Sequence, residues 1–162
     1  NQRWMKILIG KKNTRKAKRK NMAYKIYFDV NVLLDLTLLR KNHADIETVI
    51  KEVERGLING FVCGATIHTL SYFLIKQYDI KHTKQILLNL LSFISVVDIT
   101  KEDIQKALFT DFKDIEDAIQ VQTALTFKMD YFLTSDTQLM KASSETLPII
   151  NASAFLKNIA VN

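Results

Sequence analysis

The sequence predicts an α/β domain with a central, mostly parallel five-stranded sheet flanked by helices. Short apolar runs alternate along the chain with longer segments in which apolar residues recur at helical spacing. The short runs are apolar throughout, as strands buried on both faces are, and each is followed by a helical segment, which is the connection that parallel strands require. The 162 residues suit one domain, and one proline with four glycines excludes a collagen-like or Pro/Gly-rich disordered chain.

The strands are expected where the short apolar runs lie. These are Lys25–Phe28, Phe61–Gly64, Ser95–Ile99, Tyr131–Leu133 and Pro148–Ile150. Parallel sheets carry their binding sites at the rim formed by the carboxyl ends of the strands. The residues that follow each run are therefore the first candidates for function.

Helices are expected between these strands, over Ile46–Leu57, Thr66–Gln77, His82–Phe93 and Asp114–Lys128, with another after Thr100 and a short one at the end. Gly60 is expected to stop the first helix, because glycine commonly follows a helix end. Thr100 and Asp103 form a start similar to a capping box, and Ser153 is expected to cap the last helix.

The net charge of +6 is concentrated at the start of the chain. Residues 1–21 hold nine Lys or Arg and no acid, whereas the remaining 141 residues hold 14 basic and 17 acidic side chains, a net charge of −3. A block of like charge cannot bury an apolar face, so we expect 1–21 to be disordered. It is either a basic arm that contacts phosphates or, as we favour, a vector-derived or upstream extension before Met22. The folded domain is then residues 22–162.

Several classes of protein are excluded. A single cysteine, Cys63, rules out an internal disulfide framework and fits a reducing cytoplasm. Ile86–Val97 is the longest apolar stretch, is interrupted by polar residues, and is shorter than the roughly 20 residues of a membrane span. We therefore expect a cytoplasmic protein with no membrane partner. The chain also lacks a glycine-rich phosphate loop.

Four aspartates lie where the ends of strands and the start of a helix should meet. Asp29 and Asp136 follow two predicted strands, and Asp114 and Asp117 lie in the first turn of a predicted helix. Each alone is best explained as a helix cap or a dipole-complementing residue. Together at one rim they would repel each other, and a divalent cation is the usual compensation. Oxygen ligands without a matching His/Cys set favour Mg²⁺ or Mn²⁺ over zinc.

The blocks FDVNVLLD (28–35), DIEDAIQ (114–120) and FLTSD (132–136) resemble the signature blocks of the PIN domain family, in matching order and spacing. The resemblance runs from about Lys25 to the C-terminus and is strongest to VapC-type toxins of bacterial toxin–antitoxin pairs. It implies a PIN-like three-layer fold and metal-dependent ribonuclease activity. By position it implies catalytic and metal-holding roles for Asp29, Asp117 and Asp136, with Asp114 as a supporting ligand and Asn31 orienting Asp29.

One position departs from the family pattern. PIN domains usually carry an acid in the helix after the second strand, and Ala65–Lys76 contains none. Thr69 takes this place, with His68 as the alternative. A neutral ligand predicts weaker metal binding, and with it reduced activity. Ser135, beside Asp136, is a further supporting candidate because its hydroxyl could bind a phosphate or a water.

The sequence therefore predicts a Mg²⁺- or Mn²⁺-dependent endoribonuclease, acting as the toxin of a type II toxin–antitoxin pair. The resemblance implies an RNA substrate, a cognate antitoxin and a homodimer. The alternative is a non-catalytic PIN-like module that binds RNA or a protein partner, which the missing acid favours. An aspartyl-nucleophile phosphatase is a weak third hypothesis, because Asn31 stands where a second aspartate would be needed.

Overall fold

The computed structural model describes residues 23–160, so the basic segment 1–21 and its predicted disorder lie outside the described residues. Five strands pair in the order β3-β2-β1-β4-β5, and every pair is parallel. They are β1 (Tyr24–Phe28), β2 (Ile58–Cys63), β3 (Ile94–Val97), β4 (Tyr131–Leu133) and β5 (Ile149–Ile150). The predicted five-stranded sheet is thereby confirmed, and it is parallel throughout residues 23–160.

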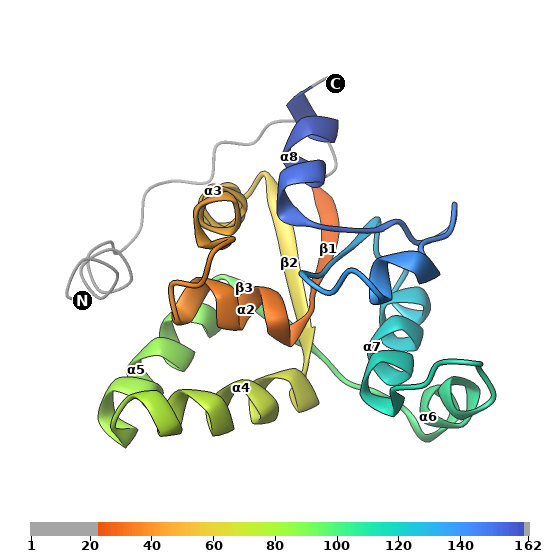
Figure 1. Ribbon diagram of the computed structural model, residues 1–162, viewed down its shortest axis with the longest axis horizontal. Helices are drawn as coiled ribbons and strands as arrows, with labels where there is room; N and C mark the ends of the chain where they lie inside the picture. Colours follow the sequence, from red (N-terminus) through yellow and green to blue (C-terminus); the bar gives the residue numbers. More distant parts are fainter. Residues whose placement is uncertain (1–22, 161–162) are drawn as a thin grey trace.

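Helices cover both faces of this sheet. They are α2 (Val30–Thr37), α3 (His43–Glu54), α4 (Gly64–Gln77), α5 (Ile80–Leu91), α6 (Lys101–Leu108), α7 (Ile115–Thr126), the 3₁₀ helix η1 (Leu139–Ala142) and α8 (Ala152–Ala160). In Figure 1, α6 and α7 lie to the right of the strands and α2, α3 and α5 to the left. The arrangement is the three-layer α/β architecture that the sequence predicts.

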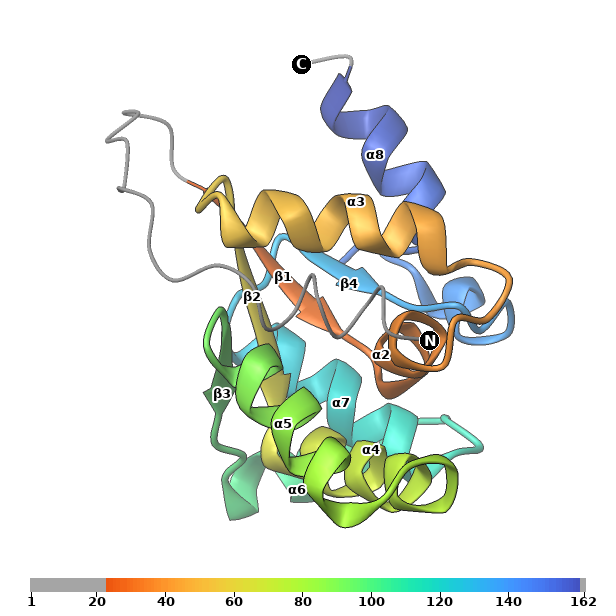
Figure 2. The same ribbon diagram turned by 90° about the vertical axis from the view of Figure 1, so that its left-hand side faces the viewer.

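Alternation along the strands explains the two layers of core. In β1, the side chains of Ile26 and Phe28 pack with α2, α3, α4, α5 and α8, whereas Tyr27 between them packs with α7 and η1. Successive side chains of a strand point to opposite faces, so one strand supplies both cores. Figure 2 shows α3 and α8 above the strands and α7 beyond them.

Two of the predicted helix boundaries are wrong. The helix expected to stop at Gly60 ends at Glu54, and Gly56, with φ +74°, follows it. Gly60 lies inside β2, where an added Cβ would come within 2.8 Å of the Phe28 ring. Asn151, not Ser153, accepts the hydrogen bond from Ala154 N (2.8 Å) that caps α8. These glycine and cap roles depend on tertiary neighbours that the local pattern does not show.

Other local predictions are confirmed. Thr100 and Asp103 form a reciprocal capping box at the start of α6. The buried Asp103 also accepts a hydrogen bond from Thr126 at the end of α7 (2.7 Å), which ties the two helices together. Cys63 is fully buried, as expected of a small core residue. Within residues 23–160, every helix is too short or too polar to cross a bilayer.

The order of the strands in the sheet shows where a binding site is expected. β1 leads outward through β2 to β3, whereas β4 leads to β5 on the other side. The direction of winding therefore changes between β1 and β4. In open parallel sheets, ligands bind outside the carboxyl ends of the strands at such a switch point. Asp29 and Asp136 follow these two strands.

Candidate metal centre

Asp29 connects β1 to α2 and is the most buried of the predicted acids, with 1% of its surface exposed. It occupies the N-cap position of α2, yet its side chain makes no capping hydrogen bond. Instead, Oδ2 accepts hydrogen bonds from Thr134 Oγ1 (2.7 Å) and Asn31 Nδ2 (3.2 Å). The other oxygen, Oδ1, is buried and has no hydrogen-bond partner among the described residues. The structure therefore leaves one carboxylate oxygen without the capping role that its position would suggest.

Burial raises the pKa of Asp29, and the hydrogen bonds from Thr134 and Asn31 oppose that rise. A carboxylate oxygen that is buried without a partner is costly, so such an atom calls for a proton, a water or a cation. Asn31 contacts Asp29 as the family resemblance implied. The same hydrogen bond gives no support to the phosphatase hypothesis, because Asn31 acts here as a donor to the carboxylate.

Asp114 and Asp117 lie at the start of α7, with different tasks. Asp114 is the N-cap, and its Oδ1 accepts hydrogen bonds from the backbone N–H of Glu116 (2.8 Å) and Asp117 (3.3 Å). Asp117 is half-buried, and its pKa is raised to about 6 by burial, then by the charges of Asp114, Asp29 and Asp136. The other three predicted acids therefore all act electrostatically on Asp117. Asp117 is where their fields converge.

Asp136 lies in the turn after β4. Its Oδ1 accepts hydrogen bonds from the backbone N–H of Gln138 (2.7 Å) and Leu139 (3.5 Å), so it also stabilises the turn into η1. Its own backbone N–H donates to Thr134 Oγ1 (3.0 Å). Thr134 is fully buried and thus links Asp29 with Asp136 through one hydroxyl.

Ser135 lies apart from these acids in its bonding. Its hydroxyl donates to Oδ2 of Asp35 (2.6 Å), a buried carboxylate on α2 that Asn42 also contacts (3.3 Å). The neighbouring Thr134 makes the contacts that link the two predicted ligands. The sequence offers no signal that separates the two hydroxyls, because both stand in the same short turn.

Thr69 on α4, the position that departs from the family pattern, contacts an acid from another helix. Thr69 Oγ1 donates to Oε1 of Glu116 in the first turn of α7 (3.3 Å), whereas the backbone carbonyl of His68 accepts a hydrogen bond from Ser71 Oγ (2.7 Å). Glu116 also contributes to raising the pKa of Asp117. Sequence reasoning left Glu116 out, although it stands between the two selected acids of DIEDAIQ. Thr69, which stands on α4 where the family usually has an acid, is therefore next to the carboxylate of Glu116 from α7.

The acids share an electrostatic field without forming a finished ligand set. Across residues 23–160, no group of three or more His, Cys, Asp or Glu side chains is arranged to hold a metal ion. Even so, the donors are all hard oxygens, and one of them is buried without a partner. The raised pKa of Asp117 reflects its burial first and then the negative charge of the neighbouring acids. These residues fit a Mg²⁺ or Mn²⁺ ion better than any softer metal.

A buried polar network holds the helices around these acids. The Tyr27 hydroxyl accepts from Cys63 N (3.2 Å) and lies 3.4 Å from Thr66 Oγ1, which in turn donates to Gln120 Oε1 (3.5 Å). β1, β2, α4 and α7 are thereby joined below the acidic rim. Burial also raises the pKa of Tyr27, so it stays a neutral phenol in this network.

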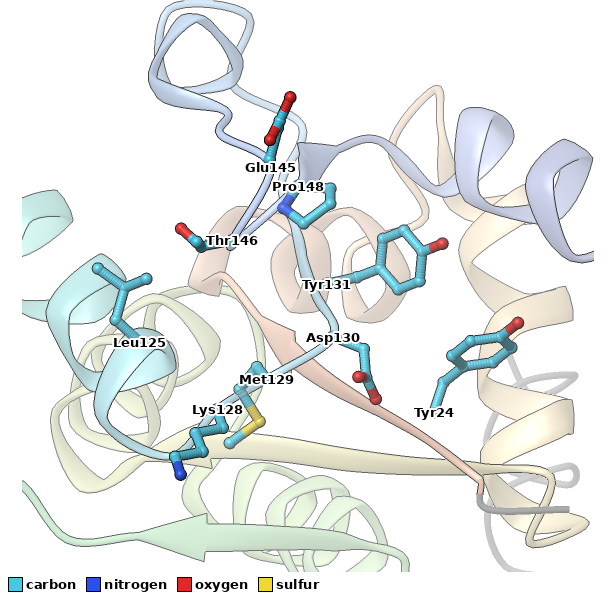
Figure 3. A pocket seen from close by; sticks show the side chains of 9 residues that line it. All are labelled: Tyr24, Leu125, Lys128, Met129, Asp130, Tyr131, Glu145, Thr146 and Pro148. Atoms are coloured by element: carbon cyan, nitrogen blue, oxygen red, sulfur yellow. The ribbon is translucent and has the colours of Figure 1, made fainter.

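A pocket of about 500 Å³ lies at the opposite end of the sheet. Tyr24, Asp130 and Pro148 line it, at the beginnings of β1, β4 and β5 (Figure 3). None of the predicted site residues lines this pocket.

Fold and site together define a parallel α/β domain with an acidic rim at its switch point. A family model described as the PIN domain matches residues 25–138, and the chain belongs to the PIN domain family. No curated protein matches the chain. The family assignment confirms the resemblance drawn from the three sequence blocks.

Solved structures share the fold. PAE2754 from Pyrobaculum aerophilum has a TM-score of 0.62 at 19% identity, over 87% of this chain and 98% of the other. VapBC2 from Rickettsia felis, bound to a DNA fragment from their promoter, has 0.58 at 9%, over 78% and 98%. Mycobacterium tuberculosis VapC20, a toxin that cleaves the sarcin–ricin loop, has 0.59 at 11%, over 72% and 94%.

Proposed function

We propose that this PIN domain is a metal-dependent endoribonuclease that hydrolyses RNA phosphodiester bonds with Mg²⁺ or Mn²⁺. Two observations carry the proposal: the buried Oδ1 of Asp29 has no hydrogen-bond partner among the described residues, and burial together with the charges of Asp114, Asp29 and Asp136 raises the pKa of Asp117 to about 6. A divalent cation bound by both side chains would give Oδ1 of Asp29 a partner and would offset the negative charge around Asp117. PIN domains are generally metal-dependent nucleases, which agrees with this chemistry.

In this proposal Asp29, Asp117 and Asp136 hold the ion, with Asp114 in support. Bound there, the ion would stabilise negative charge on a phosphoryl oxygen and lower the pKa of a water. The protein's own part is positioning. Asn31 and Thr134 fix Oδ2 of Asp29 and so leave Oδ1 for the ion. Hydrolysis of this kind needs no covalent enzyme intermediate.

We further propose that the protein acts in the cytoplasm as the toxin of a type II toxin–antitoxin pair. The fold shared with VapBC2 and VapC20 supports this proposal. An antitoxin segment that covers the acidic rim, and a homodimer, are the partners that this assignment implies. Induced expression in Escherichia coli should slow growth, and Asp117→Asn should relieve that effect. Equal growth arrest by both proteins would contradict the toxin proposal.

The ribonuclease proposal is tested by RNA cleavage with purified full-length protein. Wild type should cleave RNA with Mn²⁺ and lose this activity in EDTA, and Asp117→Asn should be inactive while folded. Glu145→Gln, at an exposed position by the distant pocket, is the matched control and should cleave like wild type. Cleavage by Asp117→Asn at the wild-type rate would overturn the assignment.

One alternative function has an observation in its favour. No metal-holding group is formed among residues 23–160, and α4 offers Thr69 where the family has an acid. A non-catalytic PIN module that binds RNA or a protein would have both features. Such a module need not take up Mn²⁺, so calorimetric titration with Mn²⁺ separates the two functions.

A further inference from the structure

The helix that carries Thr69 presents an aromatic and basic surface along the same face. Tyr72, Phe73 and Lys76 follow Thr69 at spacings of three, four and seven residues, so all four share one side of α4. We name Tyr72, Phe73 and Lys76 the α4 strip. Thr69 contacts Glu116 at the acidic rim, and the strip continues from there along a helix that lies below α2 in Figure 1.

The strip has the chemistry of a surface that binds unpaired nucleotides. Tyr72 and Phe73 are 55% and 39% exposed and contact each other edge to face, with ring centroids 5.4 Å apart. The Lys76 ammonium lies 4.0 Å from the centre of the Tyr72 ring and donates to its hydroxyl (2.6 Å). Exposed aromatic rings stack on bases, and a lysine beside them pairs with the backbone phosphate.

The charge of the domain makes Lys76 the feature of this surface that suits RNA. Residues 22–162 carry a net charge of −3, and the acidic rim itself repels phosphates, so the domain has no general attraction for RNA. A substrate held at the rim needs local contacts. Among the described residues, none of the ion pairs involves Lys76, so its charge is uncompensated by a carboxylate.

We propose that the α4 strip binds one or two unpaired nucleotides of the RNA substrate next to the scissile phosphate, by base stacking on Tyr72 and Phe73 and phosphate contact with Lys76. The length of the strip suits one or two nucleotides, because Lys76 lies about 10 Å along the helix axis from Thr69. The inference rests on the proposed ribonuclease function for its substrate, but the binding itself is measured without cleavage.

The test measures binding of a fluorescently labelled single-stranded RNA by anisotropy, with the full chain in EDTA. Tyr72→Ala and Phe73→Ala should each weaken binding about tenfold, and Tyr72→Phe, which keeps the ring, should bind nearly as wild type. Lys76→Gln should lower the slope of log affinity against log salt by about 0.7. Leu88→Ala is the matched control, because Leu88 is 65% exposed and lies on α5 rather than on the helix that carries the strip.

Each outcome decides the proposal. It is supported if the two ring deletions weaken RNA binding while Leu88→Ala does not, with all variants unfolding at wild-type temperatures. The proposal is overturned if Tyr72→Ala and Phe73→Ala each bind the RNA with wild-type affinity, or if neither wild type nor these variants bind it. An unchanged RNA affinity with loss of self-association in sedimentation also overturns it, and would assign the strip to a second copy of this chain. RNA cleavage with Mn²⁺, measured on the same samples, reports separately on the ribonuclease function.

Discussion

At the scale of single residues, the geometry assigns different work to side chains that look alike in the sequence. The carboxylates of Asp114 and Asp136 accept hydrogen bonds from backbone N–H groups. Asp29 occupies the N-cap position of α2, but its side chain makes no capping hydrogen bond. The positions of Asp29 and Asp136 could be predicted, because Asp29 directly follows β1 and Asp136 lies three residues after the end of β4. The sequence could not predict that Thr134, rather than Ser135, contacts Asp29, because this depends on which hydroxyl points toward Asp29 in the fold.

The first prediction concerns the stability of the metal-free protein. Asp117 has a folded pKa of about 6, above its ordinary value of 3.8, so between these pH values the folded state binds more protons than the unfolded state. Stability contributed by this group therefore falls as pH rises from 4 to 6. In EDTA, Asp117→Asn should raise the melting temperature at pH 7.5 and change it little at pH 4.5. Thermal unfolding at both pH values measures this, and a lower melting temperature at pH 7.5 would contradict it.

The second prediction concerns the missing acid of α4. Glu116 is placed to supply that charge from α7, with Thr69 holding it by a hydrogen bond. Glu116→Gln should weaken Mn²⁺ binding, and Thr69→Glu added to Glu116→Gln should restore it by exchanging the two positions. Thr69→Glu alone should gain little, because it sets a second carboxylate against Glu116. Calorimetry on the three variants decides this. Wild-type affinity of Glu116→Gln would remove Glu116 from the site.

At the scale of elements, the presence of each strand and the α6 capping box are local features that the sequence predicts, although β2 spans Ile58–Cys63 rather than Phe61–Gly64. The end of α3 was not predicted, because two glycines, Gly56 and Gly60, follow the same apolar pattern. Gly56 takes a positive φ that ends the helix, whereas Gly60 is needed where the Phe28 ring crosses β2. Only the pairing of β1 with β2 reveals that second requirement.

The third prediction tests this close approach. Gly60→Ala should lower the free energy of unfolding by about 1–3 kcal/mol, because the new methyl group overlaps the buried Phe28 ring and meets Val53 at 3.3 Å. Gly64→Ala is the control, since nothing lies within 4 Å of its added Cβ at the start of α4. It should be neutral or stabilising by up to about 1 kcal/mol. Chemical denaturation of both variants measures the difference, and equal stability would show that the core yields at Gly60.

At the scale of the whole molecule, charge is divided between the start of the chain and the domain. Residues 1–21 carry +9 and residues 22–162 carry −3, so the excess positive charge and the predicted site belong to different parts of the chain. The fold class followed from the alternation of strands and helices. The acidic rim followed from the topology of parallel sheets, because acids distant in sequence meet wherever strands end together.

The fourth prediction separates these parts. If 1–21 is a phosphate-binding arm, its removal should lower non-specific RNA affinity and flatten the dependence of that affinity on salt, by release of fewer counterions. Cleavage of a short RNA should persist, because the predicted ligands all lie in the domain. Binding measured at several salt concentrations checks this. An unchanged affinity and slope would support our favoured interpretation of 1–21 as an extension.

The central claim is that Asp29, Asp117 and Asp136 together hold one divalent cation, and calorimetric titration of the metal-free full chain with Mn²⁺ tests it most directly. At pH 7.5, above the raised pKa of Asp117, wild type and the control Glu145→Gln should bind Mn²⁺ with equal affinity. Asp117→Asn should bind at least about tenfold more weakly, as expected for the loss of one charged ligand. Absence of Mn²⁺ binding by wild type, or equal binding by Asp117→Asn, would contradict the account.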